Sequence, residues 1–160
     1  MKKANIALIF TIILSSALFA AGQSQKDLVI KTARALETSP LSADTIAMRE
    51  KALMWVIETK DVSVNVCGGV FSLFSDKKNK NSPDMTTSYT ISMAAFKLEN
   101  PGSTDENDAQ LAGLESALKT YEAIVKEKPK TKNDKIDALL QKRADGQLAG
   151  LVKGADCAKK

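Results

Sequence analysis

Histidine is absent from the 160-residue chain. Its absence excludes the Ser–His and Cys–His arrangements that activate many protein nucleophiles. It also removes the commonest side-chain ligand of transition metals, and the two cysteines cannot complete a zinc site without several carboxylates. The sequence therefore predicts no catalytic residue, no metal site and no cofactor.

Residues that interrupt helices are scarce as well, since the chain has only eight glycines and four prolines. Aromatic residues make up only 5% of the chain, whereas the strong helix formers Ala, Leu, Lys and Glu are plentiful. This composition favours an all-α protein over a sheet, because strands are enriched in β-branched and aromatic residues.

The N-terminus has the pattern of a secretory signal peptide. Lys2 and Lys3 precede a largely apolar run that ends in the small residues Ala20, Ala21 and Gly22. We expect cleavage near Gly22, which leaves 138 residues, enough for one domain with its own core. The removed segment holds two lysines and no acidic residue, so the net charge falls from +4 to +2. An uncleaved membrane anchor is the alternative, because the run is just long enough to span a bilayer.

The strongest helical signal covers about residues 104–128. Ser103 and Glu106 have the spacing of a capping box, and Pro129 provides a stop. One apolar stripe with steps of three and four residues runs between these signals: Leu111, Leu114, Leu118, Tyr121 and Val125. We therefore expect a long helix here, around which the other elements pack.

Shorter helices are predicted before and after this one. The first covers about residues 25–36, and the second runs from a cap at Ser42 or Asp44 to about Thr59. The third runs from a cap at Ser82 to about residue 98. After the long helix, one helix starts from a cap at Asn133 and a last one covers residues 148–154. Residues 52–57, which include the only tryptophan, Trp55, are apolar on every side, and this predicts a buried turn of helix.

One segment gives conflicting signals. Val62, Val64 and Val66 alternate with polar residues as in a strand, whereas the apolar residues from Val66 to Phe74 follow helical spacing. We favour a helix over residues 63–75. The complete prediction is a single-domain, all-α bundle of about six or seven helices around the helix at 104–128, occupying residues 23–160.

The two cysteines, Cys67 and Cys157, are expected to form a disulfide, because exported chains fold in oxidising compartments. Their bond would close a loop of about 90 residues and would hold down the C-terminal tail. Two free thiols or an intermolecular bond are the alternatives.

Lysines gather in two places, residues 76–80 and 126–135. No aromatic residues are interleaved with them and acidic residues lie nearby, so we interpret them as solubilising loops and expect no nucleic-acid partner. An anionic surface such as lipid is a minor alternative, without stable membrane insertion once the signal is removed.

The favoured function is that of an exported, non-catalytic interaction or structural module of the cell envelope, periplasmic or extracellular, with an envelope or extracellular protein as partner. A first alternative is a carrier that holds a small apolar ligand between helices. A second is a hydrolase that uses a carboxylate pair, with Glu115 and Glu122 as candidates. The candidate residues for the carrier's pocket are Trp55, Met85, Tyr89, Met93 and Phe96.

Overall fold

Helices account for all the regular structure in the part of the chain that the computed structural model describes, residues 23–155 and 157. The predicted signal peptide at 1–22 lies outside the described residues. Residues 23–38 are helical, and the elements that follow are α2 (Ala43–Glu58), α3 (Gly68–Phe71), α4 (Ser82–Glu99), α5 (Glu106–Glu127), the 3-10 turn η1 (Pro129–Thr131), α6 (Asp134–Ala144) and α7 (Leu148–Gly154). The predicted all-α class is confirmed.

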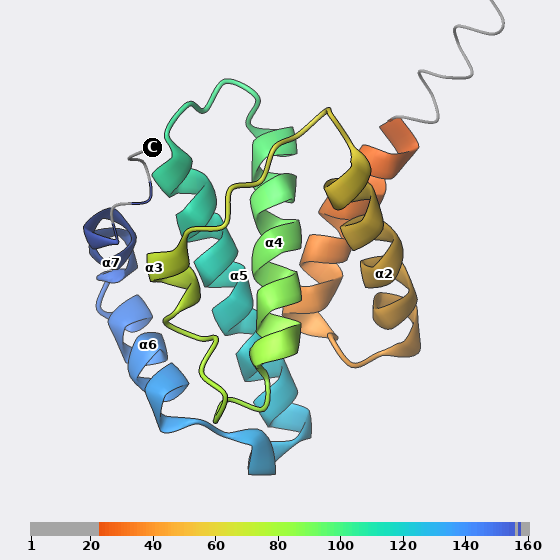
Figure 1. Ribbon diagram of the computed structural model, residues 1–160. Coiled ribbons are helices and arrows are strands. Elements are labelled where there is room, and N and C mark those ends of the chain that lie inside the picture. Colours follow the sequence, from red (N-terminus) through yellow and green to blue (C-terminus); the bar gives the residue numbers. More distant parts are fainter. Residues whose placement is uncertain (1–22, 156, 158–160) are drawn as a thin grey trace, which may run out of the picture.

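The centre of the bundle is the pair α4 and α5, which lie side by side (Figure 1). α5 is the predicted long helix, and Leu114, Leu118 and Tyr121 of its stripe are buried. Its buried surface is wider than the stripe, because Ser116 and Thr120 are also covered. Residues 23–38 and α2 pack on one side of this pair, and α3, α6 and α7 pack on the other.

Two small buried groups let α4 and α5 approach closely. Gly113 on α5 faces Tyr89 and Met93 on α4. Ser88 on α4 lies 3.0 Å, oxygen to oxygen, from Ser116 on α5. Large side chains at these positions would hold the helices apart, so the pair depends on small residues for its contact.

The predicted helix starts are partly correct. Ser42 caps α2 by accepting from the Thr45 N–H, and Asn133 caps α6. The expected cap at Ser82 is wrong by one residue, because Ser82 is already helical and follows the cap residue Asn81.

The predicted capping box at the start of α5 is wrong. Asp105 is the cap, and its carboxylate accepts from the Asn107 N–H at 2.9 Å. Ser103 instead donates to Asp108 at 3.2 Å, and Glu106 forms an ion pair with a lysine of α4. Because α5 begins at Glu106, Asp105 and not Ser103 is in the position from which a side chain accepts from a free N–H of the first turn.

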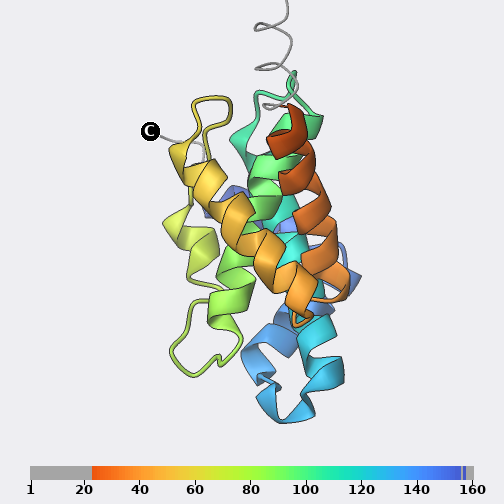
Figure 2. The ribbon, with the colours of Figure 1, turned by 90° about the vertical axis from the view of Figure 1, so that its right-hand side faces the viewer.

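The expectation that residues 52–57 are buried on all sides is also wrong. α2 lies at the edge of the bundle, so only its inner side, with Ala52 and Val56, is covered (Figure 2). Trp55 is half-buried, while Met54 and Ile57 are 54% and 67% exposed. Residues 52–57 therefore contain more apolar side chains than the inner side of α2 can bury.

The predicted helix at 63–75 is largely wrong as well. Only Gly68–Phe71 form a helix, and residues 62–67 have no regular secondary structure. This segment crosses α4 from the end of α2 to the start of α3 (Figure 1). The strand-like alternation is present without a paired strand, since Val62 and Val64 are half-buried and Ser63 and Asn65 are exposed.

The expected disulfide is present between Cys67 and Cys157, whose Cα atoms are 5.3 Å apart. Both cysteines are buried in the cluster that includes Val70, Leu148 and Val152. The bond therefore joins the start of α3 to the chain just after α7, and it fixes the far end of the segment that crosses α4.

Candidate functional site

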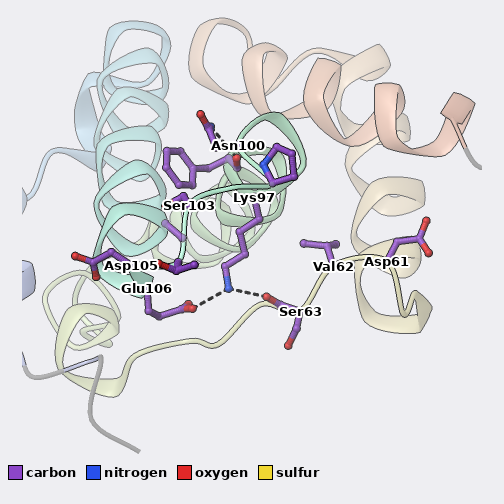
Figure 3. A pocket seen from close by; sticks show the side chains of 12 residues that line it. Asp61, Val62, Ser63, Lys97, Asn100, Ser103, Asp105 and Glu106 are labelled. Atoms are coloured by element: carbon purple, nitrogen blue, oxygen red, sulfur yellow. Dashed lines mark hydrogen bonds and ion pairs between the residues drawn. The ribbon is translucent and has the colours of Figure 1, made fainter.

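The segment 59–66, called the crossing segment below, is held by side chains of the central helix pair. Lys97 on α4 donates to the Ser63 carbonyl at 2.8 Å and forms an ion pair with Glu106 at 2.8 Å (Figure 3). Gln110 on α5 donates to the Asn65 carbonyl at 2.5 Å. The backbone carbonyls of Ser63 and Asn65 therefore face the same edge of the crossing segment.

The Gln110 side chain is held in place by a second hydrogen bond, to Tyr89 on α4. It is fully buried, and its carbonyl accepts a hydrogen bond from the Tyr89 hydroxyl. Burial raises the pKa of Tyr89 to about 12, with a contribution from the Glu106 charge and an opposing one from a backbone hydrogen bond at Cys67. Tyr89 therefore stays a neutral hydrogen-bond donor at physiological pH. Since Lys97 lies on α4 and Gln110 on α5, the two helices together determine the position of the crossing segment.

The other edge of the crossing segment is open. In an extended chain, the N–H and C=O of one residue point to one edge and those of the next residue to the other. Because the carbonyls of Ser63 and Asn65 face Lys97 and Gln110, we infer that the backbone groups of Val62, Val64 and Val66 face the opposite edge. Among the described residues, the N–H groups of 62–66 donate no hydrogen bond.

A groove lined by both apolar and polar residues lies along the crossing segment. It encloses about 330 Å³ between the end of α2, the crossing segment and α4, where Thr90 forms part of the floor. Thr90 is seven residues, about two helical turns, before Lys97 on α4, which places the groove on the edge opposite the bonded carbonyls. Other residues that line it are Val56, Ile57, Thr59, Lys60, Val62, Ser63, Val64 and Val66.

The groove carries the most exposed large apolar side chains of the described residues. Ile57 and Val66, which line it, are 67% and 46% exposed, and Met54 lies one turn before Ile57 on α2. Clustered exposed apolar side chains mark interaction sites more often than isolated ones do. An open backbone edge beside apolar side chains is the geometry that receives an extended peptide.

A second cleft, of about 320 Å³, lies on the bonded edge of the crossing segment (Figure 3). Its charged groups already have partners: Lys97 bonds to Ser63 and Glu106, Asp105 caps α5, and Asp61 forms an ion pair with Lys26 at 2.9 Å. These interactions stabilise the loop that joins α4 to α5 and the crossing segment. We therefore assign this cleft a structural role.

The structure does not bring the five candidate pocket residues together. Met85, Tyr89 and Met93 are fully buried between α4 and α5 in one core cluster, and Phe96 packs against that cluster. Trp55 packs against the other cluster, beside Val29 and Ala52. Three of the five are thus surrounded by core side chains.

The two candidate carboxylates are not joined in one site either. Glu122 binds Arg143 through both of its oxygens, each at 2.8 Å. The shallow hollow of about 600 Å³ beside Glu122 is lined by neighbouring side chains that do not include Glu115. Pairing with Arg143 leaves Glu122 engaged in holding α6 against α5.

Two further findings concern the described residues only. They contain no group of three or more Cys, Asp or Glu side chains placed to hold a metal ion. None of their helices has the length and apolar character to cross a membrane. Comparisons with protein-family models, curated proteins and solved structures find no match to this chain.

Sequence reasoning missed the residues that build the groove. The exposed Ile57 was assigned to a buried turn, and Val66 to a helix. The sequence signal that could have identified the groove is the excess of apolar residues in 52–57, because a helix at the edge of a bundle can bury only one side. The roles of Lys97 and Gln110 had no local signal, because their partners lie 34 and 45 residues earlier in the chain.

Proposed function

We propose that this protein is an exported, non-catalytic binding module, and that its groove receives an extended peptide segment of a partner protein in the cell envelope or outside the cell. The observation that carries the proposal is the open edge of Val62, Val64 and Val66 beside the exposed Ile57. The peptide adds as a strand to this edge and places alternate apolar side chains in the groove.

The proposed export agrees with two properties of the chain. Its N-terminal pattern is that of a signal peptide, and its only cysteines are bonded to each other. The disulfide also supports binding, because it fixes one end of the crossing segment, while Lys97 and Gln110 fix its middle. A fixed edge loses little conformational freedom when a peptide binds.

The length of the open edge and the volume of the groove set the length and the side chains of the expected peptide. Three residues offer outward backbone groups, so the paired stretch is about five residues, or roughly 17 Å at 3.4 Å per residue. The groove of about 330 Å³ has room for two or three medium-sized side chains. We expect β-branched or aliphatic residues at alternate positions, as in other cases of strand addition.

A displayed library of random linear peptides tests the proposal. Peptides are selected on the wild-type protein and counted again on the double variant Ile57→Glu, Val66→Glu. Both side chains are at the surface, with Ile57 67% and Val66 46% exposed, so the fold is expected to tolerate the change. The matched control is Ala138→Glu, at an exposed position of α6.

The expected result is a set of alternating apolar peptides that bind the wild type and Ala138→Glu but bind the double variant at least about tenfold more weakly. In NMR spectra, the bound peptide should slow exchange of the amide protons of Val62, Val64 and Val66. Equal binding to the double variant, or protection elsewhere on the surface, would show that the groove is not the site. Concentration-dependent dimers that the double variant abolishes would identify a second copy of the chain as the occupant instead.

A further inference from the structure

The two lysine-rich segments, separated by about 50 residues in the sequence, lie side by side in the structure. The Asn81 side chain donates to the Thr131 carbonyl at 2.8 Å, and Lys135 forms an ion pair with Asp76. Both segments lie at the end of the bundle where α4 begins and α5 ends (Figures 1 and 2). We call residues 76–80 and 126–135 the lysine end.

The lysine end is strongly positive against a negative remainder. Its two segments contain eight lysines and three acidic residues, whereas the rest of residues 23–160 contains 13 basic and 16 acidic residues. All eight lysines are exposed. Only two of them, Lys132 and Lys135, have an ion pair among the described residues. Six cations therefore point into solvent from one end of the molecule: Lys77, Lys78, Lys80, Lys126, Lys128 and Lys130.

We propose that the lysine end binds peripherally to the surface of an anionic phospholipid bilayer. Six ammonium groups without an ion pair among the described residues lie on the last turn of α5, on η1 and on the adjoining loops, and each lysine near an anionic membrane surface adds favourable electrostatic energy. The proposal is independent of the peptide groove, which lies along the side of the bundle.

The chemistry of the cations favours a lipid surface over a nucleic acid. The lysine end contains no arginine and no aromatic residue, although the chain has three arginines elsewhere. Arginine forks and aromatic rings recognise phosphates and bases at fixed positions. Lysine is a point charge on a flexible stem, and this suits headgroups that move laterally in the plane of a bilayer. The lysine end also lacks large apolar side chains, so binding does not require insertion.

The bound orientation follows from the shape of the bundle. With the lysine end against the membrane, α4 and α5 stand away from the surface, and the loop 100–105 lies at the far end (Figure 1). The groove is lined by Thr90, which is eight residues, or roughly 12 Å along α4, from Ser82, so it lies along the side of the bundle and not on the membrane-facing end. A peripherally bound protein can therefore still present its groove.

Co-sedimentation with vesicles tests this proposal. The protein is expressed from its full sequence, purified without detergent, and mixed with vesicles of phosphatidylglycerol and phosphatidylcholine at 30:70, or of phosphatidylcholine alone. The test variant replaces five lysines of the lysine end by glutamine: Lys77, Lys78, Lys80, Lys128 and Lys130. The matched control replaces five exposed lysines outside it, which also have no ion pair among the described residues: Lys31, Lys51, Lys60, Lys142 and Lys153.

We expect the wild type and the control to partition onto the anionic vesicles within about twofold of each other, and the lysine-end variant at least about 100-fold more weakly. Wild-type binding should fall at least about tenfold between 50 and 150 mM NaCl and be negligible on phosphatidylcholine. Equal losses in both variants would overturn the proposal, since net charge alone would then explain binding. Absence of binding to anionic vesicles would also overturn it, as would tighter binding to duplex DNA at equal phosphate concentration.

A second measurement locates the contact. Vesicles that contain a paramagnetic headgroup lipid should broaden the amide signals of residues 76–80 and 126–135, and leave those of 100–105 unchanged. Broadening centred on any other surface would overturn the assigned orientation and the proposal with it.

Discussion

The substitution Gly113→Ala tests the close packing of α4 against α5. A Cβ at this position would lie 2.7 Å from Met93 Cγ and from Tyr89 Cδ2, and 2.9 Å from the Tyr89 backbone oxygen. The Met93 side chain can move, but the Tyr89 oxygen moves only with α4. Overpacking of this kind costs about 1 to 3 kcal/mol. Alanine recovers roughly 0.5 to 1 kcal/mol through its higher helix propensity, so the expected net destabilisation is about 1 kcal/mol and at most about 2.5 kcal/mol.

Gly150→Ala is the matched control, because Gly150 is also helical but nothing lies within 4 Å of its added Cβ. It should stabilise the protein by about 0.5 to 1 kcal/mol. For a domain of this size, 1 kcal/mol corresponds to about 3 to 4 °C in Tm. Thermal and urea unfolding followed by circular dichroism should therefore shift in opposite directions for the two variants. If Gly113→Ala is as stable as Gly150→Ala, the helices are farther apart than described.

Two further predictions concern the disulfide and the tyrosines. Reduction of the Cys67–Cys157 bond should lower the free energy of unfolding by up to roughly 4 to 5 kcal/mol, the chain-entropy value for a loop of about 90 residues, and hydrogen exchange should accelerate first after residue 146. Uniform acceleration would contradict the local role of the bond. Burial raises the pKa of Tyr89 and of Tyr121 to about 12, so both bind their protons more tightly in the folded state than in the unfolded state, where the pKa is near 10. Stability that is complete below pH 10 should therefore fall between pH 10 and 12, by roughly 2 to 3 kcal/mol per tyrosine. Tyrosinate absorbance at 295 nm that develops near pH 10 with the helical spectrum intact would refute this.

Much of the fold could be predicted because its signals are local. The stripe around Leu114 and Leu118 lies on one helix, and its spacing is enough to identify α5. Asn133 and Ser42 cap helices by bonding to residues no more than three positions away. The disulfide was predictable for a different reason, since a chain with two cysteines offers only one intramolecular pairing.

The predictions failed where tertiary contacts decide between local alternatives. Val66 to Phe74 have helical spacing, yet the crossing segment stays extended because Lys97 and Gln110 bind its carbonyls and the disulfide at Cys67 fixes its end. A helix over 63–75 would have to take both carbonyls into its own hydrogen-bond ladder. The fully buried Gln110 would then lose the Asn65 carbonyl, the nearer of the two acceptors of its amide nitrogen, which is costly for a buried amide.

The wrong helix prediction covers the same residues as the candidate site, because the side-chain contacts that prevent a helix here also leave one edge of the segment open. A segment held by side chains on one edge keeps its other edge free, which a helix or an inner strand of a sheet does not. The cost of that free edge is tolerable because it lies at the surface, where water can bond to the free backbone groups. The predicted helix over 63–75 fails because tertiary contacts select the extended alternative, which the alternation of Val62, Val64 and Val66 also favours locally. The proposed binding site therefore rests on the free edge of this segment and on the exposed side chains beside it.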